Sequence, residues 1–224
     1  MNKNLFILNL LLFVQNIQSK EILTIYSTDI GRVNAAGSDN IYHKFLQRIE
    51  KDLNVEFKIV FSPPSRSHDA FHKNQTSCLF PYAKDKLMPI HDDDMILSKS
   101  LGELELYAVT KITQPKITAK NIRTKKSFSI RSLYDKGVNF SDPNKKFWFV
   151  ESQRQLYEML EWQRVDYVLE SIPDAYYTFP GGQAKYEQQY HFDHSFTAIV
   201  LNEHLVCQKN NPLANRVIEY VNRL

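Results

Sequence analysis

The sequence has few glycines and few cysteines, and it has no long apolar run after its first residues. Its six glycines form no Gly-x-Ser-x-Gly motif and no phosphate-binding loop, so the sequence lacks the usual hydrolase and nucleotide-binding signatures. A net charge of +3, with 24% charged residues, is far below the basic excess of a nucleic-acid-binding protein. Neither of the two cysteines has a second cysteine nearby, which argues against a cysteine-based zinc site.

The first nineteen residues have a pattern of their own. A short basic start, Met1–Asn4, precedes an almost wholly apolar run from Leu5 to Val14. About ten apolar residues are too few to span a bilayer, for which about twenty are needed, but they suit a secretory signal. A buried first strand or an uncleaved anchor is the alternative. We expect residues 1–19 to be a signal peptide, so the mature protein starts near Lys20 and is soluble in the periplasm or secreted.

After residue 20, the spacing of apolar residues predicts alternating strands and helices. Ile41, Phe45, Ile49 and Leu53 recur every four residues and form one apolar stripe on a helix from about 38 to 53. Further helices are predicted at 64–73, 132–136, 152–163, 173–179 and from Pro212, where Leu213, Val217, Ile218 and Val221 point inward. Strands are predicted at 22–26, 55–61, 77–80, 104–109, 128–130, 147–150, 165–169, 196–201 and 205–207, with a loop over 85–100.

Strands that alternate with helices predict mostly parallel sheets that are buried on both faces. The two series of elements predict an α/β fold with two lobes, each a mostly parallel sheet flanked by helices. We expect lobe 1 to comprise residues 20–106 with 204–224 and lobe 2 to comprise residues 107–203, joined by two crossover strands. Because ligands of open α/β sheets bind at the carboxyl ends of strands, facing lobes predict a site in the cleft between them.

The order of the elements and three stretches of sequence resemble the bacterial extracellular solute-binding proteins of family 3. Residues 152–160 and 163–170 are similar to the family patterns "s-x-x-q-x-l-x-m-L" and "G-R-V-D-a-v-x-D". Pro63–Arg66 followed by Cys78–Pro81 resembles a variant of many short members, and Tyr107–Val109 and Leu205–Lys209 look like the two crossover strands. The resemblance covers nearly all of the mature chain and implies the periplasmic-binding-protein type II fold.

The resemblance also implies a function. We expect a monomeric, non-enzymatic binding protein without cofactor or metal, which captures a small-molecule ligand for an ABC permease and has no nucleic-acid partner. A sensor that presents its closed form to a membrane partner is one alternative, and a dehydratase or lyase on the same fold is another. Amino-acid-binding members usually carry Thr-x-x-Arg after the third strand, but residues 81–86 of this chain contain no arginine. The resemblance therefore does not carry over the arginine that grips an α-carboxylate.

Four polar residues are candidates for ligand binding. Arg131 follows a predicted strand, and the pair Arg131-Ser132 stands where the family usually has Gly-Thr. Ser132 opens a helix whose N–H groups form an anion site, to which Arg131 adds a bidentate contact. A surface arginine beside an ordinary cap is the alternative. Arg66 has the equivalent place in the first lobe, where a salt bridge within the lobe is the alternative. Glu170 matches the family position at which an Asp meets a ligand ammonium, although it could instead be a hinge or cap residue.

Aromatic residues and the cysteines complete the candidates. Tyr26, Phe80 and Tyr82 lie at strand ends and could stack on a ligand, with packing in the core as the alternative. Together with the charged candidates they predict a zwitterionic or bifunctional ligand. Cys78 and Cys207 are candidates for a disulfide in an exported protein, with free buried thiols as the alternative.

Two histidine segments are weaker candidates for metal binding or catalysis. His191-Phe192-Asp193-His194 looks extended, so its two histidines point to opposite faces. His91-Asp92-Asp93-Asp94 lacks the glycine and spacing of a calcium loop. Glu170 with His68 is the acid–base pair that a lyase on this fold would use. We expect no catalytic residues and no metal site.

Overall fold

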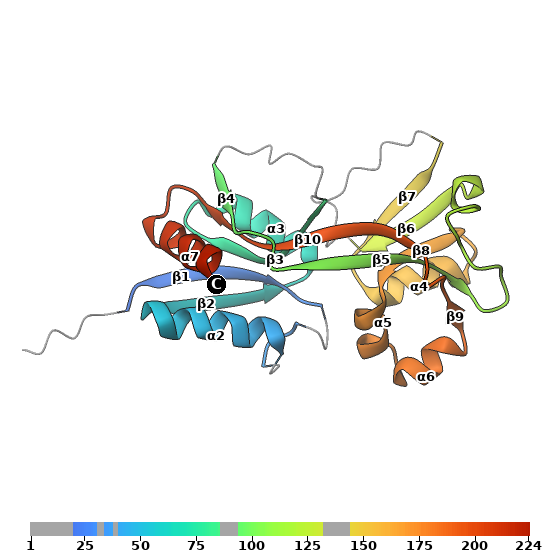
Figure 1. Cartoon of the computed structure of the whole chain (residues 1–224), viewed down its shortest axis with the longest axis horizontal. Helices are drawn as coiled ribbons and strands as arrows, with labels where there is room; N and C mark the ends of the chain where they lie inside the picture. Colours follow the sequence, from blue (N-terminus) through green and yellow to red (C-terminus); the bar gives the residue numbers. More distant parts are fainter. Residues whose placement is uncertain (1–19, 31–33, 38–39, 86–93, 132–143) are drawn as a thin grey trace, which may run out of the picture.

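The computed structural model describes residues 20–30, 34–37, 40–85, 94–131 and 144–224, which form two lobes around one mixed sheet (Figure 1). The strand order is β2-β1-β3-β10-β5-β8-β6-β7, with β4 paired to β10 and β9 paired to β5. The strands are β1 (Ile22–Thr28), β2 (Glu56–Ser62), β3 (Cys78–Asp85), β4 (Met95–Leu97), β5 (Gly102–Lys111), β6 (Ser127–Arg131), β7 (Lys146–Val150), β8 (Tyr167–Ser171), β9 (Tyr190–His191) and β10 (Thr197–Gln208). The helices are α2 (Ile41–Leu53), α3 (Pro64–Lys73), the 3-10 helix η1 (Ile122–Thr124), α4 (Gln153–Glu161), α5 (Ile172–Thr178), α6 (Gly182–Glu187) and α7 (Pro212–Arg223).

Each lobe is built on a parallel set of strands. In lobe 1, β1 pairs in parallel with β2 and with β3, and in lobe 2, β6 pairs in parallel with β7 and with β8. Between them, β10 runs antiparallel to β3 and β5, and β5 runs antiparallel to β8. The predicted two-lobed α/β fold with two crossover strands, β5 and β10, is thus confirmed. The predicted lobe boundaries fall inside these two strands and stay a prediction.

Helices cover both faces of the lobe 1 sheet because alternate residues of its strands point to opposite sides. Leu23, Ile25 and Cys207 pack against α2 and α7 on one face. Leu79 and Val206 pack with Phe71 of α3 on the other. In lobe 2, α4, α5 and α6 pack on one face through a cluster of aromatic and aliphatic residues that contains Leu156, Tyr157, Leu160, Ala175, Tyr186 and Tyr190.

Of the two long helices of lobe 1, α7 begins at Pro212 as predicted, whereas α2 begins at Ile41, three residues after its predicted start. Asn40 caps α2 by accepting a hydrogen bond from the backbone N–H of His43 at 2.9 Å, which satisfies a donor of the first turn. Ile49 of its predicted stripe is buried, but Ile41 is 77% exposed because it lies at the first position of the helix, beyond the edge of the core. The predicted inward residues of α7 (Leu213, Val217, Ile218 and Val221) are all buried.

The largest differences from the predicted strands are in β3 and β10. β3 does not end before Pro81 but continues to Asp85, because its ladder with β10 shifts register between His204 and Val206, opposite the proline. A bulge of this kind accommodates a residue without an N–H donor. β10 is one strand rather than two, since its polar middle is held on both edges by β3 and β5.

Four short elements, β4, η1, α6 and β9, were not predicted. β4 lies inside the predicted loop over 85–100, and α6 follows Pro180 and Gly181, where the chain was expected to stop being helical. Both are too short for the apolar spacing of three or six residues to distinguish them from loops. The predicted signal peptide (1–19) and the predicted helix at 132–136 lie outside the described residues. Within the described part of the chain, no helix has the length and apolar character to span a membrane.

A disulfide joins the two central strands of lobe 1. Cys78 of β3 and Cys207 of β10 are register partners with Cα atoms 4.0 Å apart, and their sulfur atoms are bonded. Both residues are fully buried in the lobe 1 core. The bridge therefore connects the first segment of lobe 1 to the segment that returns to it, across a sequence separation of 129 residues.

Removing this bridge should destabilise the protein strongly. For a loop of this length the chain-entropy model gives a loss of about 4–5 kcal/mol in the free energy of unfolding. Urea unfolding of the double variant Cys78→Ala with Cys207→Ala measures the loss. Wild type unfolded with reductant is the matched control, because it opens the bridge without changing the core. Two free thiols in oxidised, denatured wild type would contradict the assignment.

Candidate functional site

A pocket of about 290 Å³ lies where the carboxyl ends of parallel strands from both lobes face each other. Its lining residues are Asp29, Ile30, Pro63 and Pro64 from lobe 1 and Arg131, Glu151, Ser152, Gln153 and Thr178 from lobe 2. They lie at or just after the ends of β1, β2, β6 and β7, except for Thr178, which ends α5. Pockets of about 370 and 470 Å³ border β5 and α4, but neither has a lining residue from β1, β2 or α3. We refer to the first as the cleft pocket.

Arg131 is the cation of the cleft pocket. It ends β6 and is only 4% exposed. Its Nε atom is buried and has no hydrogen-bond partner among the described residues. Leaving a buried donor of a charged group unpaired is costly. The guanidinium of Arg131 is therefore suited to an anionic group that enters the pocket.

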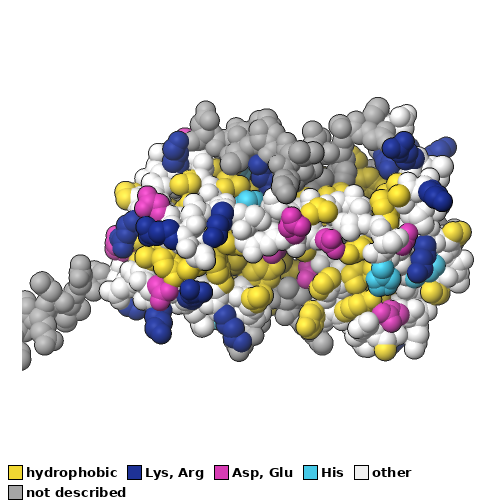
Figure 2. Space-filling view, viewed as in Figure 1, with side chains coloured by type: hydrophobic (Ala, Val, Ile, Leu, Met, Phe, Trp, Pro, Cys, Tyr) yellow, Lys and Arg dark blue, Asp and Glu magenta, His cyan; other side chains and the backbone are white. Residues whose placement is uncertain are grey.

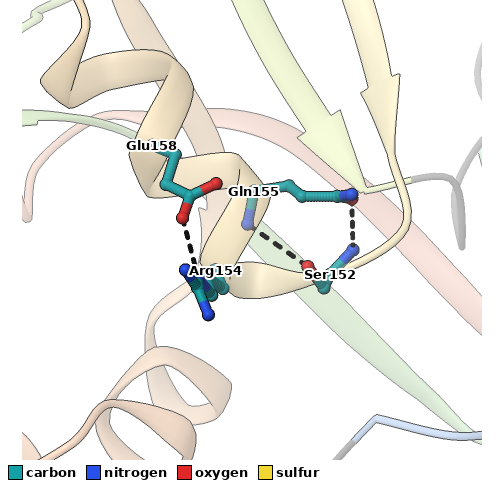
Figure 3. A network of polar contacts seen from close by, with 4 residues as sticks. All are labelled: Ser152, Arg154, Gln155 and Glu158. Carbon is teal, nitrogen blue, oxygen red and sulfur yellow. Dashed lines mark hydrogen bonds and ion pairs between the residues drawn. The ribbon is translucent and has the colours of Figure 1, made fainter.

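The amino end of α4 forms the lobe 2 wall beside Arg131. Ser152 Oγ accepts a hydrogen bond from the N–H of Gln155 at 3.2 Å, and Gln155 Oε1 accepts one from the N–H of Ser152 at 3.3 Å (Figure 3). This capping box leaves the N–H groups of Gln153 and Arg154 in the first turn, where they have no partner within the helix. The Arg154 side chain is turned to Glu158, with 2.7 Å between Nε and Oε1. The helix start thus presents backbone donors and a positive dipole end.

Glu170 lies behind the pocket wall. It is fully buried, is not among the lining residues, and accepts hydrogen bonds from Gln153 Nε2 at 3.4 Å and from the N–H of Ser171 at 3.2 Å. Burial raises the pKa of Glu170 to about 7, and the positive charge of Arg131 opposes this rise. Burial also raises the pKa of the neighbouring Asp174 to about 6. Both carboxyl groups therefore titrate close to neutral pH.

The other predicted ligand residues lie outside the lining of the cleft pocket. Arg66 is exposed on the first turn of α3, two residues after Pro64. Phe80 is 2% exposed, with its ring 5.5 Å from that of Tyr42 and 5.4 Å from that of Phe45, so it packs in the core.

The two predicted tyrosines pack along α3. The Tyr26 hydroxyl accepts a hydrogen bond from Asn74 Nδ2 at 3.3 Å, and the Tyr82 ring lies 5.9 Å from the ring of buried His68. Ser132 lies outside the described residues. Of the predicted ligand residues that the structure describes, only Arg131 lines the pocket.

Sequence reasoning did not select Asp29, Glu151, Gln153 or Thr178. Asp29 follows β1, and its position at a strand end was a usable signal. Ser152 and Gln155 form the Ser-x-x-Gln capping pattern, which marks the helix start that carries Gln153. Thr178 ends α5, and only the packing of α5 brings it to the pocket.

The histidines make other contacts. His191 Nε2 lies 2.7 Å from the carbonyl oxygen of Gln114, and the His194 ring lies 4.2 Å from the ring of Phe192. His68 and Glu170, the predicted acid–base pair, are both buried, and neither lines the cleft pocket. The described residues contain no group of three or more His, Cys, Asp or Glu placed to hold a metal ion. His91, Asp92 and Asp93 lie outside the described residues.

Solved structures share this architecture, although the chain matches no protein-family model and no curated protein sequence. An arginine transport-system periplasmic binding protein from Legionella pneumophila is similar with a TM-score of 0.69 and 14% identity, over 91% of this chain and 92% of that one. The chain has the fold of periplasmic binding proteins. The GluR0 ligand-binding core from Nostoc punctiforme, in complex with L-glutamate, is similar with a TM-score of 0.66 and 10% identity, over 90% and 92%. The periplasmic VFT2 domain of Bordetella pertussis BvgS is similar with a TM-score of 0.67 and 9% identity, over 90% and 86%.

The stability of the protein should depend on pH through Glu170. The pKa of Glu170 is about 7 in the folded protein, above the ordinary 4.5. The free energy of unfolding is therefore highest below pH 4.5, where Glu170 is protonated in both states. It falls as the pH rises to about 7, because the unfolded chain loses its proton first. The loss amounts to about 3 kcal/mol. Glu170→Gln keeps the shape without the charge and should remove this part of the pH dependence.

Urea unfolding of wild type and Glu170→Gln at pH 5 and pH 8 measures the difference. Asp174→Asn is the control, because Asp174 titrates in the same direction at about 6. Equal losses of stability in wild type and Glu170→Gln would show that Glu170 is charged over the whole range.

Proposed function

We propose that this chain is an exported, non-enzymatic solute-binding protein that captures a small polar ligand as its lobes close. The observation that carries the proposal is the cleft pocket, which takes lining residues from strand ends of both lobes. A ligand that contacts both lobes favours their closed arrangement, so binding and closure form one coupled equilibrium. The volume of about 290 Å³ suits a ligand of amino-acid size.

The charges of the pocket support a ligand that carries both an amine and a carboxylate. Arg131 offers a guanidinium for the carboxylate, while Asp29 of lobe 1 and Glu151 of lobe 2 offer carboxylates for the amine. The similar structures include a GluR0 core in complex with L-glutamate and an arginine transport-system binding protein. Glutamate and arginine both carry these two groups.

We infer delivery to an ABC-type permease, with the protein acting as a monomer without cofactor. The alternative is a sensor that presents its closed form to a membrane partner, and a pull-down from the membrane fraction separates the two. A lyase on the same fold would consume its ligand, which NMR of a ligand–protein mixture detects. We propose no nucleic-acid partner, because Lys and Arg side chains are spread among Asp and Glu on the face shown in Figure 2.

Export should remove the first residues. We expect the mature chain to begin at or near Lys20, because the short apolar run from Leu5 to Val14 suits a signal peptide. Mass analysis of the protein from the periplasmic fraction measures its amino terminus. Material in that fraction that retains Met1 would contradict the cleavage, and protein confined to the cytoplasm would contradict export.

A small zwitterion should stabilise the protein. We expect native mass spectrometry to find a co-purified small molecule. We also expect a thermal-shift panel of L-arginine, L-glutamate, L-cysteine, dicarboxylates and diamines to raise the melting temperature with at least one compound. NMR should then find that compound unconsumed. No stabilising compound and no co-purified molecule would count against solute binding.

Arg66 supplies the lobe 1 contact in this proposal, since it lies just after Pro63 and Pro64 of the pocket. Arg66→Ala should weaken binding of the stabilising compound by about ten- to a hundredfold, or about 1.5–3 kcal/mol. The melting temperature without compound should not change, because the side chain is exposed. Arg48→Ala, an exposed arginine of α2 paired with Asp52, is the matched control. Calorimetry that gives Arg66→Ala the wild-type affinity would remove Arg66 from the site.

A further inference from the structure

We propose that the acidic group of the solute binds on lobe 2, between Arg131 and the amino end of α4, and that Glu170 is a positioning residue that takes up a proton as this group enters. This inference rests on the proposed solute-binding function and concerns the same cleft pocket. It gives the two acidic groups different roles: the acid of the solute contacts the protein directly, and Glu170 acts through its neighbours.

The anion site has two independent parts. Arg131 lines the pocket, is 4% exposed, and has a buried Nε atom without a hydrogen-bond partner among the described residues. Ser152 and Gln153 of the α4 start line the same pocket, with first-turn N–H donors. The remaining charged lining residues, Asp29 and Glu151, are carboxylates that repel an anion. The acidic group is therefore confined to the Arg131 side of the pocket.

Glu170 is separated from the solute by the residues that it orients. It is fully buried and absent from the lining, and it holds the side-chain amide of Gln153 at 3.4 Å. The register of β6 with β8, in which Ile130 pairs with Leu169, places Arg131 and Glu170 side by side at the ends of neighbouring strands. Arg131 thus lies between a buried carboxyl group and the entering acid.

Charged and titratable side chains from the neighbouring strands and helices surround Glu170. Arg131 comes from β6, Asp174 from α5, Tyr157 from α4 and Tyr186 from α6. On β5, Tyr107 is its register partner and donates its hydroxyl to Glu105. The pKa values of Tyr157, Tyr186 and Tyr107 are raised, so these tyrosines stay neutral at ordinary pH.

A single cation therefore acts on two carboxyl groups in this cluster. The charge of Arg131 opposes the rise that burial causes in the pKa of Glu170 and of Asp174, and the negative charge of Asp174 raises the pKa of Glu170 further. A bound acidic group adds a third negative charge beside the same guanidinium. In a buried site this arrangement is costly, and a proton on Glu170 relieves it.

The coupling between solute binding and protonation of Glu170 fixes the direction in which affinity changes with pH. Without solute, the pKa of Glu170 is about 7, so below that pH the group is protonated before and after binding. Above it, binding takes up one proton, and affinity should fall by up to about tenfold per pH unit. Asp174, with a pKa of about 6, contributes in the same direction at lower pH.

The first test needs no solute. A carbon-13 NMR titration of glutamate carboxyl groups, assigned with Glu170→Gln, gives the pKa of Glu170 in the intact protein. We expect a value near neutral that rises in Arg131→Gln, because the variant removes the nearby cation. Arg164→Gln is the matched control, since Arg164 is an exposed arginine of the same lobe that packs over Trp162. An ordinary pKa, or one that does not respond to Arg131→Gln, overturns the proposal.

The second test compares solutes with and without the acidic group. Calorimetry at pH 6 and pH 8, in buffers with different protonation enthalpies, measures affinity and proton uptake. The probes are L-arginine against agmatine and L-cysteine against cysteamine, two pairs that differ only in the carboxylate. We expect an amino acid of the panel to bind at least about tenfold more tightly than its amine, as a charge-assisted contact requires, and to take up a proton at pH 8.

The variants separate the two roles. Arg131→Gln should lose affinity at both pH values. Glu170→Gln should keep the affinity at pH 6 and lose most of the pH dependence and proton uptake, with Asp174 accounting for the rest; a merely structural residue would change neither. An amine that binds as tightly as its amino acid, or a Glu170→Gln variant with the wild-type pH profile, overturns the proposal and leaves solute binding intact. Failure of every panel compound to bind counts against the proposed function itself.

Discussion

The pairing of β10 with β3 on one edge and β5 on the other joins the two lobes into a single sheet. β10 pairs with β5 from Thr197 to Glu203 and with β3 from Leu201 to Cys207, so one strand crosses from lobe 2 to lobe 1 without a loop. The disulfide between Cys78 and Cys207 lies at the lobe 1 end of this ladder. β5 makes the opposite crossing and pairs with β8 of lobe 2. The relative positions of the lobes depend on these strand pairs.

This shared sheet determines where the site lies. Because β1 and β2 in lobe 1 and β6 and β7 in lobe 2 are parallel sets, their carboxyl ends gather at one edge of each lobe. The crossover strands turn these edges toward each other, and the cleft pocket draws its lining from both. Apart from Thr178 at the end of α5, the polar residues of the pocket belong to strand ends and helix starts, where backbone N–H groups are not paired in a ladder.

The electrostatics of lobe 2 follow from the same packing. Arg131 and Glu170 end neighbouring strands and are both buried, so their charges act on each other with little screening by water. Burial outweighs the guanidinium in its effect on Glu170, since desolvation is the larger cause of the raised pKa. The result is a cation that faces the pocket and a carboxyl group that responds to what the cation binds.

The sequence by itself determined the elements that depend on local pattern. The helices α2 and α7, the parallel strands and the two-lobed α/β fold follow from apolar spacing, caps and the order of elements, because these reflect neighbours close along the chain. Arg131 was found in the same way, from its place after a strand. The tertiary structure alone decided that β3 passes Pro81 and that β10 is continuous, since both depend on partners far away in sequence. It also decided that Phe80 packs in the core and that Glu170 is sealed behind Gln153, because burial is a property of contacts between distant segments rather than of any residue's position along the chain.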